Sequence, residues 1–383
     1  MKKTTVALAT LAALSSFHQW AQAQSGVTLY GVLDAGIQSF SNQNLTNHSN
    51  TTFAGNGGEL SNAWGLKGIE DIGSGMKVVY TLEGAPNLAN GRGTGLDLNS
   101  NGGLFGRQAF VGLIAPWGLI TLGQQADPAF VSFVATDPRG TAQSFSGLQT
   151  WVNSSYTSGV AGDLPNTYFN IFDSNAVGYR IKAGHFDLGL LYGFGGQTAG
   201  SSNGSIFSVG ATYQEGGLVI SAGAYHDRTA NADTSRVYNS LSEYHLGLGY
   251  SWSDWSVKGF WMQAGPNHET QPPFTTVLGT GVLGYDKFSN VGVGGAYKWS
   301  PALSFNAAYY QNHDSTQGGH MRMFALGADY ALSKHTGLYG MIGSAREGGG
   351  KNFGGGNLIT MSDATIPYGD TANGVVLGMH HSF

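Results

Sequence analysis

The stretch Gly26–Phe40 reads GVTLYGVLDAGIQSF, and its side chains alternate in character with a period of two. Leu29 and Ile37 share one parity, whereas Tyr30 and Asp34 share the other. Alternation of this kind is typical of a β-strand whose two faces meet different surroundings. The stretch therefore predicts a strand with an apolar outer face and a more polar inner face.

The same alternation recurs along the chain, and helical spacing is not sustained in the region that follows the N-terminal segment. Counted to Phe383, the sequence contains sixteen strand-like segments, separated alternately by short turns and long polar loops. Segments of about ten residues suit tilted membrane strands. We therefore predict an all-β fold, a 16-stranded antiparallel transmembrane β-barrel with short turns at one rim. Among the segments are Leu218–Arg228, Glu243–Trp252, Trp255–Ala264, Leu303–His313, Met321–Leu332 and Thr336–Ala345.

Composition favours the same architecture. Charged residues make up 11% of the chain, against about 25% in a soluble domain. No apolar run reaches the roughly 18 residues of a membrane-spanning helix. The balance of 18 Lys+Arg against 23 Asp+Glu gives no basic excess for nucleic acid. The absence of cysteine excludes disulfides and thiolate metal sites. Trp252, Trp255 and Trp299 stand near strand ends, as in an aromatic girdle at a lipid–water boundary.

The N-terminus predicts export. Two lysines precede the largely apolar Val6–Leu14, and Ala21–Ala23 has the small-x-small form of a cleavage site. We expect residues 1–23 to be a signal peptide and residues 24–383 to form one barrel domain.

Four motifs follow one another along the chain: Gly26–Gly36, Trp64–Gly73, Phe105–Leu113 with Gly118–Gly123, and Gly378–Phe383. They resemble the opening strand, the second strand, the fourth and fifth strands, and the closing strand of the general porins of β-proteobacteria and Neisseria. These porins are trimeric outer-membrane channels of Gram-negative bacteria.

This resemblance implies a homotrimer in the cell outer membrane, with water-filled channels for passive diffusion of small hydrophilic solutes and ions. It implies contact with outer-membrane lipid and lipopolysaccharide. It also implies that the terminal Phe383 is a membrane-insertion signal, read by the outer-membrane assembly machinery. We expect no enzymatic activity, no cofactor, no metal and no nucleic-acid partner.

The resemblance also assigns a constriction loop to residues 126–173, folded into the lumen. A segment this long in a compact domain requires a reason, and narrowing the pore supplies one. The loop has a formal charge of −3, and acids in a narrow wall attract cations. Its charged residues are Asp127, Asp137, Arg139, Asp163 and Asp173.

On the wall facing this loop, family members carry a cluster of arginines. Here Arg107 keeps its place, whereas the other expected positions hold Ala63, Gln124 and Phe172. The predicted constriction wall comprises Arg107, Lys67, Asp34, Gln124, Ala63 and Phe172. By strand parity, His380 and Ser382 also face the lumen. With three arginines missing, we predict a weakly selective or mildly cation-selective pore.

Two alternatives remain open at this level. A substrate-preferring porin for sugars or aromatic acids would use the aromatic side chains of the loop as a stacking surface, unless these rings only pack the loop against the wall. These residues are Trp151, Tyr156, Tyr168, Phe169 and Phe172. An exported soluble β-sandwich that binds glycans is the alternative from another class.

Overall fold

The structure is a computed structural model, and it describes residues 26–43, 48–93, 104–148, 151, 171–195, 204–228, 240–266, 274–275, 282–283, 287–314, 319–348 and 369–383. The predicted signal peptide and Asp163 lie outside these residues.

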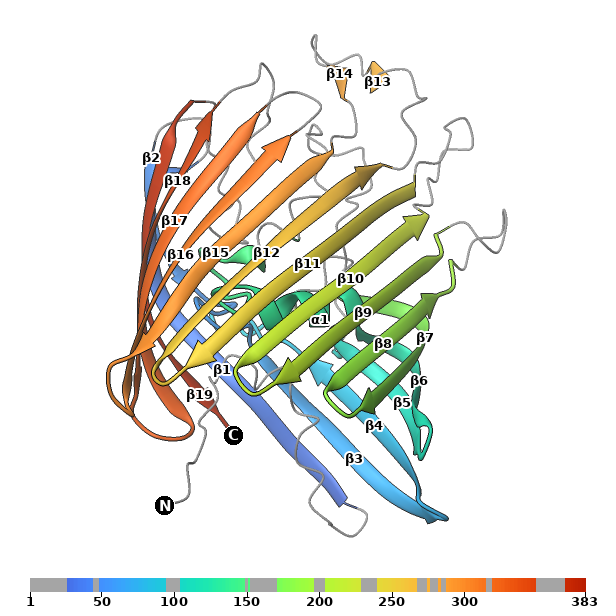
Figure 1. The fold of residues 1–383 in the computed structure, drawn as a ribbon. Coiled ribbons are helices and arrows are strands. Elements are labelled where there is room, and N and C mark those ends of the chain that lie inside the picture. Colours follow the sequence, from blue (N-terminus) through green and yellow to red (C-terminus); the bar gives the residue numbers. More distant parts are fainter. Residues whose placement is uncertain are drawn as a thin grey trace.

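One large antiparallel sheet dominates the described part of the chain, and it closes on itself because β1 pairs with β19. Figure 1 shows its tilted strands forming a barrel. The strands of this sheet are β1 (Gly26–Gln43), β2 (His48–Ala54), β3 (Ala63–Gly73), β4 (Met76–Gly84), β5 (Gln108–Ala115), β6 (Gly118–Ala126), β7 (Phe172–Ala183), β8 (Phe186–Gly193), β9 (Ile206–Glu215), β10 (Leu218–Arg228), β11 (Ser240–Trp252), β12 (Trp255–Pro266), β15 (Phe288–Lys298), β16 (Leu303–Asp314), β17 (His320–Ala331), β18 (Thr336–Gly348) and β19 (Thr371–Ser382). A separate small hairpin pairs β13 (Phe274–Thr275) with β14 (Val282–Leu283).

The sheet has 17 strands in its described residues, but β2 and β3 share one position in the barrel. The upper part of β1 pairs with β2, where Gly36 lies opposite Ala54. The lower part pairs with β3, where Val32 lies opposite Ala63. The barrel therefore has sixteen strand positions, and the prediction of a closed 16-stranded antiparallel barrel is confirmed.

The two faces of each strand differ as the period-two pattern predicts. On β1, Val27, Leu29 and Ile37 are 65%, 58% and 62% exposed, whereas Asp34 on the opposite face is fully buried. Apolar side chains on the outer face suit contact with lipid, and enclosed side chains fill the interior.

Short turns join the strands at one rim, where both ends of the described chain also lie. Gly73, Gly184 and Gly216 have φ of 87°, 59° and 59°, a left-handed region that glycine enters without steric cost. Tyr297 near one of these turns stacks on Trp255, with ring centroids 4.3 Å apart. Aromatic side chains thus stand at strand ends, as a girdle requires.

Segment 127–171 connects β6 to β7 and begins with helix α1 (Pro128–Thr136). The side chain of Asp127 accepts a hydrogen bond from Phe130 N at 2.8 Å, and a proline opens the helix, both favourable N-terminal features. Within the described residues, no helix has the length and apolarity needed to cross a membrane.

The hydrophobic core lies inside the barrel. Phe133, Phe145 and Leu148 of segment 127–171 are buried against inward-facing side chains of the strands. The wall contributes four methionines to this core, and their flexible side chains fill irregular gaps well. Those fully or nearly fully buried are Met262, Met321, Met323 and Met341.

Candidate pore constriction

Helix α1 packs on the inner faces of β8 to β12, as Figure 1 shows. It approaches the wall closely because glycines replace side chains along its path. A Cβ at Gly210 would overlap the carbonyl oxygen of Pro128, and one at Gly189 would lie 2.9 Å from Pro128 Cβ. The turn after α1 approaches the wall equally closely, since a Cβ at Gly294 would lie 2.8 Å from Pro138 Cβ.

We call these wall positions the glycine belt. It comprises Gly189, Gly210, Gly247, Gly294, Gly343 and Gly374, each in close contact with segment 127–171. The belt seats the segment directly on the backbone of the barrel, which accounts for part of the 61 glycines in the chain.

A chain of hydrogen bonds fixes the middle of α1 to β11. Ser132 Oγ lies 3.0 Å from His245 Nε2, and His245 Nδ1 lies 3.0 Å from Glu243 Oε1. This spacing resembles a hydrolytic triad, but Ser132 is only 2% exposed and sits inside a helix. The arrangement therefore anchors the helix and satisfies three buried polar groups. The sequence analysis missed Glu243 and His245, although their two-residue spacing places both on one face of β11.

The loop acids that the structure describes, Asp127, Asp137 and Asp173, are buried instead of lining an open channel. Asp137 accepts hydrogen bonds from Thr141 N at 2.6 Å and from Tyr310 Oη at 3.1 Å. Burial raises the pKa of Asp137. Asp127 and Asp173 are fully buried as well. Burial, and next the neighbouring Asp173, raise the pKa of Asp127 well above its ordinary value.

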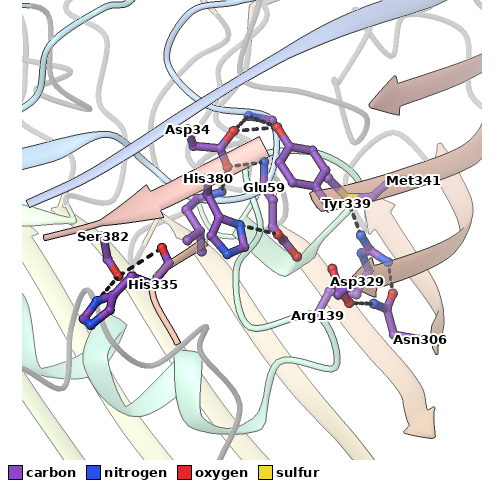
Figure 2. Close-up of polar contacts among 12 residues, drawn as sticks. Asp34, Glu59, Arg139, Asn306, Asp329, His335, Tyr339, Met341, His380 and Ser382 are labelled. Atoms are coloured by element: carbon purple, nitrogen blue, oxygen red, sulfur yellow. Dashed lines mark hydrogen bonds and ion pairs between the residues drawn. The ribbon is translucent and has the colours of Figure 1, made fainter. Parts of the chain in front are cut away.

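Arg139 extends from the segment onto the adjoining inner wall, where it contacts Asn306 of β16 and Met341 of β18 (Figure 2). Its guanidinium bonds Asn306 Oδ1, and Asn306 Nδ2 donates to Asp329 Oδ2 at 3.0 Å. Glu59 interacts with Asp329, and burial raises the pKa of Glu59. Arg139 is therefore enclosed in a polar cluster, and it is 7% exposed.

The same cluster includes His380, which was predicted to face the lumen. Its Nδ1 lies 3.3 Å from Glu59 Oε2, and its ring is stacked on Tyr339. Tyr339 Oη in turn donates to Asp34 Oδ1 at 2.5 Å (Figure 2). Ser382 lies apart from the cluster, beside His335.

Asp34, a predicted wall residue, organises the connection between β2 and β3. Its carboxylate accepts hydrogen bonds from Gly58 N, Glu59 N and Leu60 N at 3.1, 3.2 and 2.6 Å. The carboxylate thus holds this connection against the inner wall. Its fully buried side chain braces the backbone and is not open to the lumen.

Three predicted wall residues do come together, through two residues that the sequence analysis missed. Arg107 Nε donates to Glu83 Oε1 at 2.6 Å, and Arg107 Cζ lies 4.8 Å from the centroid of the Phe172 ring. Glu83 Oε2 also accepts from Tyr30 Oη at 2.7 Å, and Lys67 Nζ lies 4.8 Å from the Tyr30 centroid. Arg107 and Glu83 are 3% and 1% exposed, so their charges neutralise one another.

Gln124 and Ala63 occupy other parts of the wall. A register shift between Gly123 and Gln125 changes which side of the sheet the side chains of β6 point to from this position on. Gln124 Nε2 consequently donates to the carbonyls of Gly106 and Arg107, whereas Gln125 lines a cavity on the inner side. Ala63 is buried where β3 begins, 3% exposed.

Of the aromatic loop residues, Trp151 is fully buried against Phe130 and Phe133, with centroids 5.3 and 5.4 Å away. It packs the segment against the wall and offers no stacking surface. Tyr156, Tyr168 and Phe169 lie outside the described residues. The last predicted residue, Phe383, exchanges two backbone hydrogen bonds of 3.0 Å with Gly31.

A closed barrel with a segment seated on its inner wall is the architecture of a channel, and the comparisons with known proteins agree. A family model described as Gram-negative porin matches residues 7–350. The chain belongs to the Gram-negative porin family.

Individual porins resemble it over nearly their whole length. An outer membrane porin protein of Bordetella pertussis is 29% identical over 88% of this chain and 93% of its own. Outer membrane porin protein 32 of Delftia acidovorans is 26% identical over the full length of both chains. Among solved structures, the anion-selective porin from Comamonas acidovorans has a TM-score of 0.76 at 22% identity, covering 94% of this chain and 100% of that one.

This porin is accordingly an outer-membrane protein of the Gram-negative type that forms a water-filled channel for passive diffusion, and it is not an enzyme. Within the described residues, no group of three or more His, Asp or Glu is arranged to hold a metal ion.

Proposed function

We propose that this porin is a weakly selective channel for small hydrophilic solutes and ions, narrowed by segment 126–173. The observation that carries this proposal is that charged side chains are enclosed both on segment 126–173 and on the barrel wall. The described loop acids are buried in hydrogen bonds, and Arg107 is paired with Glu83. Paired and buried charges project little field into a lumen. Neither cations nor anions are therefore strongly favoured.

Two observations support a narrowing role for segment 126–173. It packs along the inner wall, from β8 near Gly189 to β19 near Gly374. It is fixed by Ser132 and Arg139 through side-chain hydrogen bonds. A firmly seated segment inside a barrel reduces the open cross-section and gives a defined size limit.

We further propose that the channel assembles as a homotrimer in contact with lipopolysaccharide, and that Phe383 serves the assembly machinery as an insertion signal. An outer membrane protein of Vibrio cholerae solved in a trimer form shares the fold, with a TM-score of 0.59 at 14% identity. The ring of Phe383 is 49% exposed at the end of the closing strand, open to a recognising partner.

Liposome swelling tests the diffusion function. Proteoliposomes containing the channel should swell in neutral solutes at rates that fall smoothly with solute size. Absence of swelling above protein-free liposomes in the smallest solutes would contradict the proposal.

A further inference from the structure

A cavity of about 90 Å³ lies between α1 and the inner wall formed by β5 to β9. Glutamine and threonine side chains line the cavity, together with one ion pair. They are Gln108, Thr121, Gln125, Arg180, Asp187 and Thr212. Val131 and Ser132 of α1 form part of its boundary. The cavity therefore lies directly beside the segment that we propose to narrow the pore.

Two of these side chains, Gln108 and Thr212, have polar groups free to bond an occupant, whereas Gln125 Oε1 already accepts a hydrogen bond from Thr121 Oγ1. Among the residues that the structure describes, neither the amide of Gln108 nor the hydroxyl of Thr212 makes a side-chain hydrogen bond, and Gln108 is 9% exposed. Gln125 Nε2 has a single long bond of 3.3 Å to Gly123 O. The cavity thus presents donors and acceptors suited to an occupant.

The charges at this site are already neutralised. Arg180 donates to both carboxylate oxygens of Asp187, at 2.7 and 2.6 Å. Their side chains are 27% and 23% exposed, so the pair stands at the open end of the cavity. An ionic solute would lose hydration on entering and would find no unpaired charge in compensation. A neutral solute avoids that loss.

The remaining surface is apolar. Phe110, Leu119 and Val131 line the cavity beside the amides and hydroxyls. A sugar ring matches this mixture, because each hydroxyl both donates and accepts while its C–H faces suit an aromatic ring. A volume of about 90 Å³ corresponds to roughly three water molecules, which accommodates one edge of the ring.

We propose that this cavity is a subsite for neutral polyhydroxylated solutes, pentoses or hexoses, that bind by one edge during permeation. The inference rests on the proposed diffusion function and adds a solute class to it. Its residues differ from the aromatic ones on which the sequence-based alternative of a sugar channel depended.

The test uses the full-length channel in planar bilayers, with D-glucose as the probe. Ion current is recorded as glucose increases and is compared with a polyethylene glycol of equal hydrodynamic size at equal bulk viscosity. We expect glucose to cause an additional, saturable reduction of the current. Gln108→Leu and Thr212→Val, which keep side-chain size, should each raise the half-saturating concentration about three- to tenfold, the effect of one hydrogen bond.

Ser304→Ala is the matched control, because it removes an inward-facing hydroxyl of β16 across the barrel. It should leave the glucose response unchanged. Equal reductions by glucose and the polymer in the unmodified channel would overturn the proposal, as would saturation by benzoate in place of glucose. Either result leaves the diffusion function standing, whereas a protein that conducts no ions would contradict the diffusion function itself.

Discussion

The guanidinium of Arg107 lies against the ring of Phe172, with 4.8 Å between Arg107 Cζ and the ring centroid. Family resemblance predicted arginine at both positions. The structure shows that the aromatic residue at the second position covers the arginine retained at the first. Glu83 completes the enclosure from the other side, so the wall keeps an arginine but exposes little of its charge.

Removal of this arginine should destabilise the barrel. Arg107→Gln leaves Glu83 buried without its ionic partner, which typically costs about 3–5 kcal/mol. Thermal unfolding in detergent measures the loss. Arg107→Gln combined with Glu83→Gln should recover much of it, because no charge then remains unpaired. Equal instability of the single and double variants would argue against the pairing.

Lys67 provides a test of the charge balance in the lumen. Its inward-facing side chain is half-buried and contacts the ring of Tyr30. Lys67→Gln should shift the reversal potential in a salt gradient toward cation preference, because it removes a positive charge from the wall. Lys334→Gln removes the same charge from an exposed short turn at the rim and should change the reversal potential less. Identical shifts of the reversal potential in the two variants would contradict a location of Lys67 in the ion pathway.

The glycine belt predicts a steric effect on pore size. Gly210→Ala places a Cβ against the carbonyl of Pro128 and should displace α1. We expect a loss of about 1–3 kcal/mol in stability and a changed single-channel conductance. Gly340→Ala is the control, because its Cβ would meet only the tip of Leu377 at 3.1 Å. Unchanged conductance in Gly210→Ala would indicate that α1 does not limit the pore.

Asp127 predicts a dependence of stability on pH. Burial raises the pKa of Asp127, so the folded state favours the protonated carboxyl. Its stabilising contribution is complete below the unfolded value of about 3.9 and is lost as pH rises through the higher folded pKa. Asp127→Asn keeps an acceptor for Phe130 N and removes the titration. Unfolding temperatures measured from acidic to neutral pH should therefore fall less in the variant. Parallel pH profiles would contradict the assignment.

The barrel could be predicted from sequence because alternation is a local property. Each strand carries its own period-two pattern, as Gly26–Phe40 does, and the short turns mark where the strands reverse. Even the pairing of first and last strands was expected from the motif ending at Phe383, and β1 does pair with β19.

The interior could not be predicted in the same way, because it depends on contacts between distant residues. Asp137 looks like a free loop acid in sequence, and only the position of Tyr310 shows it to be buried. Gln124 changes its facing through a bulge beside Gly123, whose φ of 128° has no clear sequence signal. The position of Glu83 on β4 predicts that its side chain points inward. That it pairs with Arg107 could be seen only once the positions of both strands were known.

Reversal potential across a salt gradient, recorded on single channels in a planar bilayer, tests the central claim most directly. A water-filled pore with enclosed charges should conduct ions in groups of three equal steps, with a reversal potential close to zero or slightly toward cations. A strongly anion-selective value would contradict this account, because it would require exposed positive charge where the structure places the Arg107–Glu83 pair.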